Sequence, residues 1–187
     1  MSAKNDINEL LRLLLNIVRT GTITEVDTQN WLCRVQTGEL ETNWIPWLTT
    51  RAGDSVTWWA PSVNEQVLLL AVGGDLSAAF VLPGIYSNDK PPPSTDGKAL
   101  VTVFPDAARF EYNPETGTLH VSGVKNTIFD SESIELNTEK FTVNADKTEI
   151  NGAVEQSGGS MSSNGVVVDD HDHGGIQKGS DWTKGIQ

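Results

Sequence analysis

Residues 126–153 read NTIFDSE, SIELNTE, KFTVNAD and KTEINGA when they are written in sevens. An apolar residue fills the fourth position of each seven, and Asp or Asn follows it in the fifth. The segment is therefore an internal repeat with a period of seven residues. The fourth-position residues are Phe129, Leu136, Val143 and Ile150, and the fifth-position residues are Asp130, Asn137, Asn144 and Asn151.

A coiled coil also repeats every seven residues, but its apolar positions lie three and four residues apart. Here the apolar positions lie two apart, as in Ile134 and Leu136 and again in Phe141 and Val143. Side chains two apart share one face of a strand, and the Asn or Asp that follows favours a turn. Each repeat is therefore predicted to be a very short strand followed by a corner.

Such short strands cannot form a stable unit alone, so the repeats need a larger assembly. A single chain could coil as a solenoid, but solenoid turns usually take more residues than one repeat offers. Alternatively, three chains wind together, and each supplies one side of every triangular layer. The period of seven favours this second arrangement. We therefore predict a trimeric intertwined β-helix over residues 98–160, in which strands pair between chains and few edges stay free.

Upstream of the repeat, residues 20–87 carry β-branched and aromatic runs separated by Gly, Pro and polar residues. This pattern predicts a small all-β domain, most simply a five-stranded barrel. The expected strands lie at residues 21–26, 31–35, 66–72 and 78–82. Five tryptophans fall in this segment and are expected to pack in the core or at interfaces. They are Trp31, Trp44, Trp47, Trp58 and Trp59.

Two further segments flank the predicted barrel. Apolar residues recur at helical spacing before it, so residues 1–19 are predicted to hold an N-terminal helix. This helix could pack on its own domain, on copies of itself or on a neighbouring protein, and the sequence leaves these alternatives open. After the barrel, residues 88–97 contain three consecutive prolines in a polar stretch. Such a stretch predicts a stiff, extended linker and a domain boundary.

Downstream of the repeat, residues 161–187 contain the stretch VVVDDHDHGG, with His171 and His173 one residue apart. In an extended segment these two imidazoles point the same way. Two ligands are too few for a tight transition-metal site, and the remaining histidine, His120, lies far upstream in the sequence. Three chains would supply six imidazole nitrogens around a three-fold axis, so we predict a metal-binding apex followed by a C-terminal tail.

The expected metal is structural, because six protein ligands leave no open coordination position. Zinc prefers four tetrahedral ligands, whereas octahedral nitrogen suits iron(II), cobalt(II) or nickel(II), and availability favours iron. An alternative interpretation is a solvated polar tail with incidental histidines. Asp169 and Asp170 could also hold a second, hard cation. The sequence marks no other ion clearly.

Composition and charge exclude several kinds of partner. The formal net charge is −12, which argues against nucleic acid or an anionic membrane surface as the main partner. The only cysteine, Cys33, allows no disulfide within the chain and is expected to be a small buried residue. No secretory signal is visible, and the apolar run at residues 10–18 is too short to span a bilayer. We therefore expect synthesis in the cytoplasm.

Several motifs together resemble the central spike of contractile injection machines, the family of baseplate assembly protein V in P2-like phages and of the R-type pyocin spike. The resemblance covers almost the whole chain. Its motifs are GTITEVD at residues 21–27, RVQTGELETNWIPW at 34–47, AGDSVTWWAPSVNEQVLLL at 52–70, VLPGIYSN at 81–88, the proline linker and the terminal HDHGG.

The resemblance implies an OB-fold-like domain, an intertwined trimeric β-helix and a pointed apex whose iron is held by His171 and His173 of three chains. It also implies a structural role in the tail of a virion or pyocin particle. The homotrimer would attach to tail hub or tube proteins through its N-terminal region. On sheath contraction it would pierce the outer membrane of a Gram-negative target. No catalytic carboxylate pair stands out, so we expect no enzymatic activity.

Two alternatives belong to other functional classes. A trimeric adhesin or receptor-binding fibre would share the β-helix, but it normally carries a large terminal receptor domain. A metalloenzyme that uses the HxH motif would need a further protein ligand, and only 14 residues follow His173. The sequence does not distinguish a phage from a pyocin, and it does not identify the target bacterium.

Overall fold

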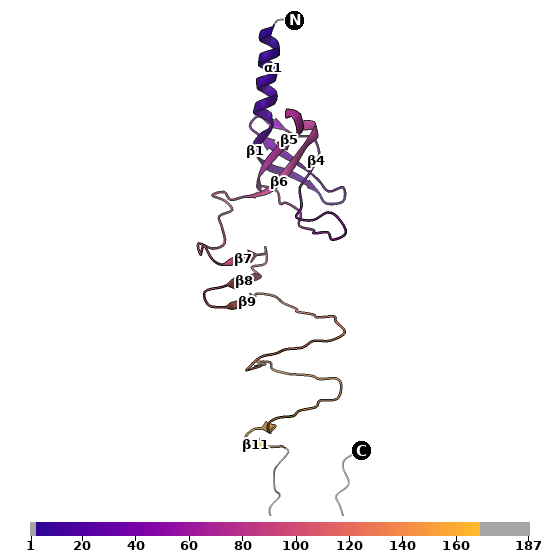
Figure 1. The fold of residues 1–187 in the computed structure, drawn as a ribbon, viewed down its shortest axis with the longest axis vertical. Coiled ribbons are helices and arrows are strands. Elements are labelled where there is room, and N and C mark those ends of the chain that lie inside the picture. The colour runs from indigo at the N-terminus through magenta and orange to yellow at the C-terminus, as the bar shows by residue number, and fades with distance from the viewer. Residues whose placement is uncertain (1–2, 169–187) are drawn as a thin grey trace, which may run out of the picture. The chain divides into compact units, whose positions relative to one another are not determined.

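The computed structural model describes residues 3–168, which divide into two units on either side of the Phe129–Asp130 bond. The first unit holds one α-helix, two short 3-10 helices and most of the strands, and the second holds a single hairpin among its described residues (Figure 1). The described part of the chain is therefore mainly β, as predicted from the sequence.

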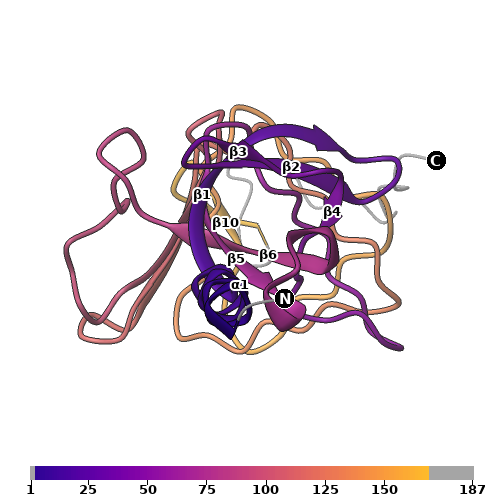
Figure 2. The ribbon, with the colours of Figure 1, turned by 90° about the horizontal axis from the view of Figure 1, so that it is seen from above.

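The barrel sheet has six strands in the order β3-β2-β1-β5-β6, with β4 paired to β2. Its closure depends on β4, because Trp47 forms a parallel bridge with Val81 of β6 and the Leu48 N–H donates to the Val81 carbonyl at 2.7 Å. Figure 2 shows these strands around a common interior. The strands are β1 (Val18–Asp27), β2 (Leu32–Thr37), β3 (Leu40–Glu41), β4 (Ile45–Pro46), β5 (Gln66–Ala71) and β6 (Ala79–Ile85).

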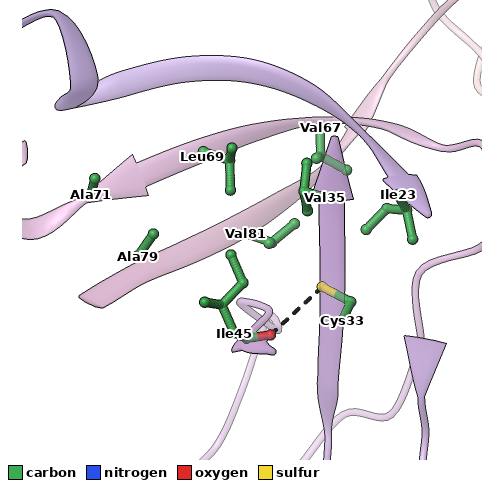
Figure 3. Packing of buried hydrophobic residues seen from close by; sticks show 9 residues of the cluster. All are labelled: Ile23, Cys33, Val35, Ile45, Val67, Leu69, Ala71, Ala79 and Val81. Carbon is green, nitrogen blue, oxygen red and sulfur yellow. Dashed lines mark hydrogen bonds between the residues drawn. The ribbon is translucent and has the colours of Figure 1, made fainter. Parts of the chain in front are cut away.

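Strict alternation in β2 and β5 builds the core. In β5, the side chains of Val67, Leu69 and Ala71 are buried, while the residues between them are half-buried. Period-two burial is what the pleat of a strand produces when one face meets a core. Figure 3 shows the nine core side chains, which come from β1, β2, β4, β5 and β6, gathered in one interior. The core consists of Ile23, Cys33, Val35, Ile45, Val67, Leu69, Ala71, Ala79 and Val81.

The glycine of the GTITEVD motif is required by a close approach of two strands. A Cβ at Gly21 would lie 2.4 Å from Val35 Cγ1 and 2.7 Å from the Gln36 carbonyl oxygen. Any side chain here would push β1 away from β2.

The N-terminal helix, α1 (Ala3–Asn16), ends at Asn16, so the predicted end at residue 19 was wrong. Val18 continues the helical spacing of apolar residues, but it pairs with Leu70 in the barrel sheet. Its β-branched side chain suits a strand, and sheet pairing overrides the local helical pattern.

Residues 98–160 were predicted as one β-helical segment, but their first part forms a sheet within the chain. Strands β7, β8 and β9 make an antiparallel meander. The strands are β7 (Leu100–Val103), β8 (Arg109–Asn113) and β9 (Thr118–Ser122). No strand or helix lies between β6 and β7, in keeping with a linker at residues 88–97.

Residues 124–161 contain no helix and no strand paired within the chain, and Figure 1 draws them as an open trace that bends back and forth. The described residues end in a hairpin of β10 (Ser162–Ser163) and β11 (Val166–Val167). Its turn residues, Asn164 and Gly165, have φ of 49° and 80°. Positive φ at both positions is typical of the tight Asn-Gly hairpin turn.

Candidate functional site

The period-seven repeat presents its apolar side chains uncovered in a single chain. Phe141 is 68% exposed, and Ile134, Leu136 and Ile150 are exposed to a similar degree. A soluble protein rarely leaves so long a row of large apolar side chains in water. The row indicates an interaction surface along residues 128–154.

The meander of β7, β8 and β9 continues this feature. The register places Leu100 opposite Tyr112, which lies opposite Leu119, and Phe110 opposite Val121. These residues share one face of the sheet because residues two apart on a strand, and residues opposite each other on paired strands, point the same way. All five are exposed. Phe110 meets the ring of Phe104 at 5.7 Å between centroids, and the rest of this apolar face is uncovered in the described residues 3–168.

The opposite face of the meander is polar in β8 and β9, whereas β7 contributes Val101 and Val103 to it. Arg109 and Glu111 form an ion pair at 2.8 Å between Nη2 and Oε2, and Glu111 lies opposite His120 in the strand register. His120 is therefore a surface residue of β9. In the described residues 3–168 no group of three or more His, Cys, Asp or Glu side chains could hold a metal ion.

A buried polar cluster fixes the end of α1 on the barrel. Arg19 Nη1 donates to Asn16 Oδ1 at 2.9 Å, and Arg19 Nε donates to Thr37 Oγ1 at 3.0 Å. The Thr37 hydroxyl in turn donates to the Thr20 carbonyl at 2.8 Å. Asn16 and Thr37 are buried, so these bonds satisfy groups that would be costly to leave unpaired. No sequence pattern predicts this cluster, because its members lie on three different elements.

Most of the barrel tryptophans lie on the surface. Trp47 packs against the core and contacts Trp58 with ring centroids 5.8 Å apart, whereas Trp31, Trp58 and Trp59 are well exposed. Trp58 and Trp59 line a hollow of about 630 Å³ next to Leu82 and Pro83. The expected core role holds for Trp47, whereas Trp59 stacks on Phe104 at 6.0 Å and still exposes most of its surface, as Trp31 and Trp58 do.

Two of the barrel's carboxylates are committed to turns. The Asn30 side-chain amide donates to Asp27 at 2.8 Å and, together with backbone N–H donors, lowers the pKa of Asp27. The Ser77 hydroxyl and N–H do the same for Asp75 at the start of η2 (Leu76–Ala78). Hydrogen bonds to a carboxylate favour its charged form, so these groups serve as stable turn caps.

The predicted metal ligands, His171 and His173, lie outside the described residues, as do Asp169 and Asp170. The metal site therefore stays a prediction. No helix in residues 3–168 is long and apolar enough to cross a membrane.

Two family models and one curated protein match this chain. Residues 19–86 match the family of the type VI secretion system/phage-baseplate injector OB domain, and residues 165–185 match the GpV apex motif. The chain is also 45% identical over 206 residues to the spike protein of Escherichia phage P2, across 96% of this chain and 98% of that protein. The first match confirms the OB-type barrel, and the second falls on the segment with the paired histidines.

Proposed function

The chain belongs to the family of phage-baseplate spike proteins, and we propose that three copies of it form a spike that breaches the outer membrane of a Gram-negative target. As a member of this family it is a structural component of a contractile tail. The trimer, the piercing action and the apex metal are the parts of this function that we propose.

The exposed period-seven repeat is the single observation that most strongly supports the proposed trimer. Phe141 and its equivalents gain a core only if other chains cover them. Two further copies offer the same repeat with the same spacing, so each layer closes without any other protein. The apolar face of the β7–β9 meander fits the same explanation, because three such faces would enclose a common interior.

Force transmission follows from this arrangement. Chains that wind around one another cannot separate without breaking many backbone hydrogen bonds between them. Axial load from sheath contraction would therefore pass along the β-helix to its tip. The OB-type barrel and the N-terminal helix would attach the trimer to a hub or tube protein. The exposed Trp58 and Trp59 beside their hollow suit such a contact.

His171 and His173 would hold a structural metal ion at the tip. The donor chemistry fits iron, because imidazole nitrogen is a good ligand for iron and three chains supply six of them. When bound, the ion would cross-link three chain ends. A closed shell of protein ligands leaves no position for a substrate, which supports a structural and non-enzymatic role. The main alternative, a trimeric adhesin, would share the β-helix but would need a receptor-binding surface.

Metal content and native mass of the purified protein test the proposal. We expect a trimer with about one iron per three chains, and we expect His171→Ala and His173→Ala to remain trimeric but lose the metal. One metal per chain would contradict the shared apex site. A metal-free monomer would exclude both the trimer and the site. Loss of the trimer in the histidine variants would show that the apex, and not the repeat, holds the chains together.

A further inference from the structure

The apolar stripe of α1 faces away from the barrel. Ile7, Leu10, Leu11, Leu14 and Leu15 are all more than half exposed, and Leu15 reaches 73%. At about 100° per residue, these five side chains span about 140° of the helix surface. They belong to one continuous stripe.

Two contacts show which side of α1 meets the barrel. Asn16 is 6% exposed and bonds to Arg19, and a Cβ at Gly74 would lie 2.2 Å from the Leu13 carbonyl oxygen. Leu13 and Asn16 lie on the side of the helix roughly opposite the stripe. The C-terminal end of α1 therefore packs on its own domain through its polar side, but the barrel does not cover the apolar stripe.

The spacing of the stripe indicates what covers it. Within α1, Ile7, Leu10 and Leu14 follow one another at intervals of three and four residues, which is the spacing of a heptad seam. Leu11 and Leu15 widen the seam beyond what a two-helix contact uses. The charged residues Glu9 and Arg12 pair with each other at 2.7 Å on the far side. A heptad seam is self-complementary, so copies of the same helix fit it.

We propose that α1 packs against α1 of two other copies, forming a parallel three-helix bundle at the N-terminal end of the spike. This inference rests on the homotrimer proposed above. A helix of 14 residues would not associate stably alone. Chains already joined through the repeat bring their helices to a high effective concentration.

The polar cluster at Asn16, Arg19 and Thr37 gives every copy the same helix direction. Because three-fold symmetry repeats this direction, the three helices run parallel and equivalent residues meet at the axis. The bundle would leave contact with hub or tube proteins to the barrel surface and to the polar sides of the helices.

Disulfide trapping in the full-length protein tests the bundle. Leu10→Cys places a thiol on the seam, and Arg12→Cys places one on the far side as a matched control. Native Cys33 is buried and would contribute little background if thiols are alkylated before unfolding. Under oxidised glutathione, we expect Leu10→Cys to form covalent dimers at least about tenfold faster than Arg12→Cys, since seam positions come within disulfide distance. One thiol per trimer must stay unpaired.

The outcomes separate this proposal from the one on which it rests. A trimer by native mass without a preferred cross-link at residue 10 would overturn the bundle and leave the spike trimer standing. The stripe would then belong to a partner protein. Equal cross-linking of both variants would also overturn the bundle, because it indicates frayed helices. A monomer by native mass would overturn both proposals.

Discussion

Cys33 shows how one buried side chain is tuned by the barrel. It is fully buried, and its thiol donates to the Ile45 carbonyl oxygen at 3.7 Å (Figure 3). Burial disfavours the thiolate and, together with the charge of Glu65, raises the pKa of Cys33 to about 11. The neutral thiol thus behaves as one more apolar member of the core.

We predict that Cys33 reacts with iodoacetamide far more slowly in the native protein than in urea at pH 8. The thiolate is the reactive form, so the native rate should rise only as the pH approaches about 11. The stability that the buried neutral thiol contributes is present below pH 9 and is lost as the pH rises toward 11. Mass spectrometry of the alkylated protein measures the rate. A native rate that levels off near pH 9 would contradict the burial.

Gly73 and Gly74 in η1 (Val72–Gly74) offer a matched pair of substitutions at the scale of single elements. Both have positive φ, at 62° and 79°, so alanine is strained at each by about 1 kcal/mol. Only Gly74 lies against α1, where an added Cβ would collide with the Leu13 backbone. Open space surrounds the corresponding position at Gly73.

We therefore expect Gly74→Ala to detach α1 from the barrel and Gly73→Ala to leave it in place. Limited trypsin digestion reports this directly, because a detached helix exposes the bond after Arg12. Thermal unfolding should show a small decrease in the midpoint temperature for Gly73→Ala and a larger decrease for Gly74→Ala. Equal protease sensitivity of the two variants would mean that the contact at Gly74 does not hold the helix.

Phe141 and Thr142 form a second matched pair, in the repeat. Phe141 is exposed in a single chain, so Phe141→Asp would change the stability of a monomer only slightly. In a three-chain layer the same change would bury three carboxylates together, and we expect the trimer to be lost or to dissociate at a much lower temperature. The side chain at position 142 is expected to point away from the apolar face that carries Phe141, so Thr142→Asp should leave the trimer intact. Native mass after stepwise heating distinguishes the two variants.

The elements that the sequence predicts well are those with long, regular patterns. The alternation through Val67 and Leu69 predicts β5, whereas β3 and β4 have two residues each and are too short to show any period. Val18 fits a helical pattern and a strand equally, and only pairing with Leu70 decides between them. The meander at residues 100–122 depends on pairing between segments outside the seven-residue repeat, so the repeat does not predict it.

The candidate functional residues also include some that the sequence predicts and some that it does not. The histidine pair is visible in the sequence because His171 and His173 are neighbours along the chain. The cluster of Asn16, Arg19 and Thr37 is not, because residues distant in sequence meet only after folding. The exposure of Phe141 adds what sequence cannot supply, namely that one chain leaves its own repeat uncovered.

At the scale of the whole molecule, charge opposes the assembly that the apolar surfaces favour. Each copy brings a formal net charge of −12, and the repeat itself contains more acidic than basic residues. Like charges repel over roughly 10 Å at 0.1 M salt and over longer distances at lower salt. Phe129, Leu136 and Val143 are exposed in a single chain, and their burial in the proposed trimer would have to outweigh this repulsion.

We therefore predict that trimer formation depends on ionic strength. After dilution from denaturant at pH 7, the trimer should form several-fold more slowly at about 20 mM NaCl than at about 500 mM, because salt screens the repulsion between chains. Replacing Glu135 and Glu149 by Gln should weaken this dependence, whereas the same change at Glu39 in the barrel should not. Native mass at successive times measures the rate. Faster assembly at low salt would show that attractive ion pairs between chains, and not the apolar row opposed by net charge, control how the spike forms.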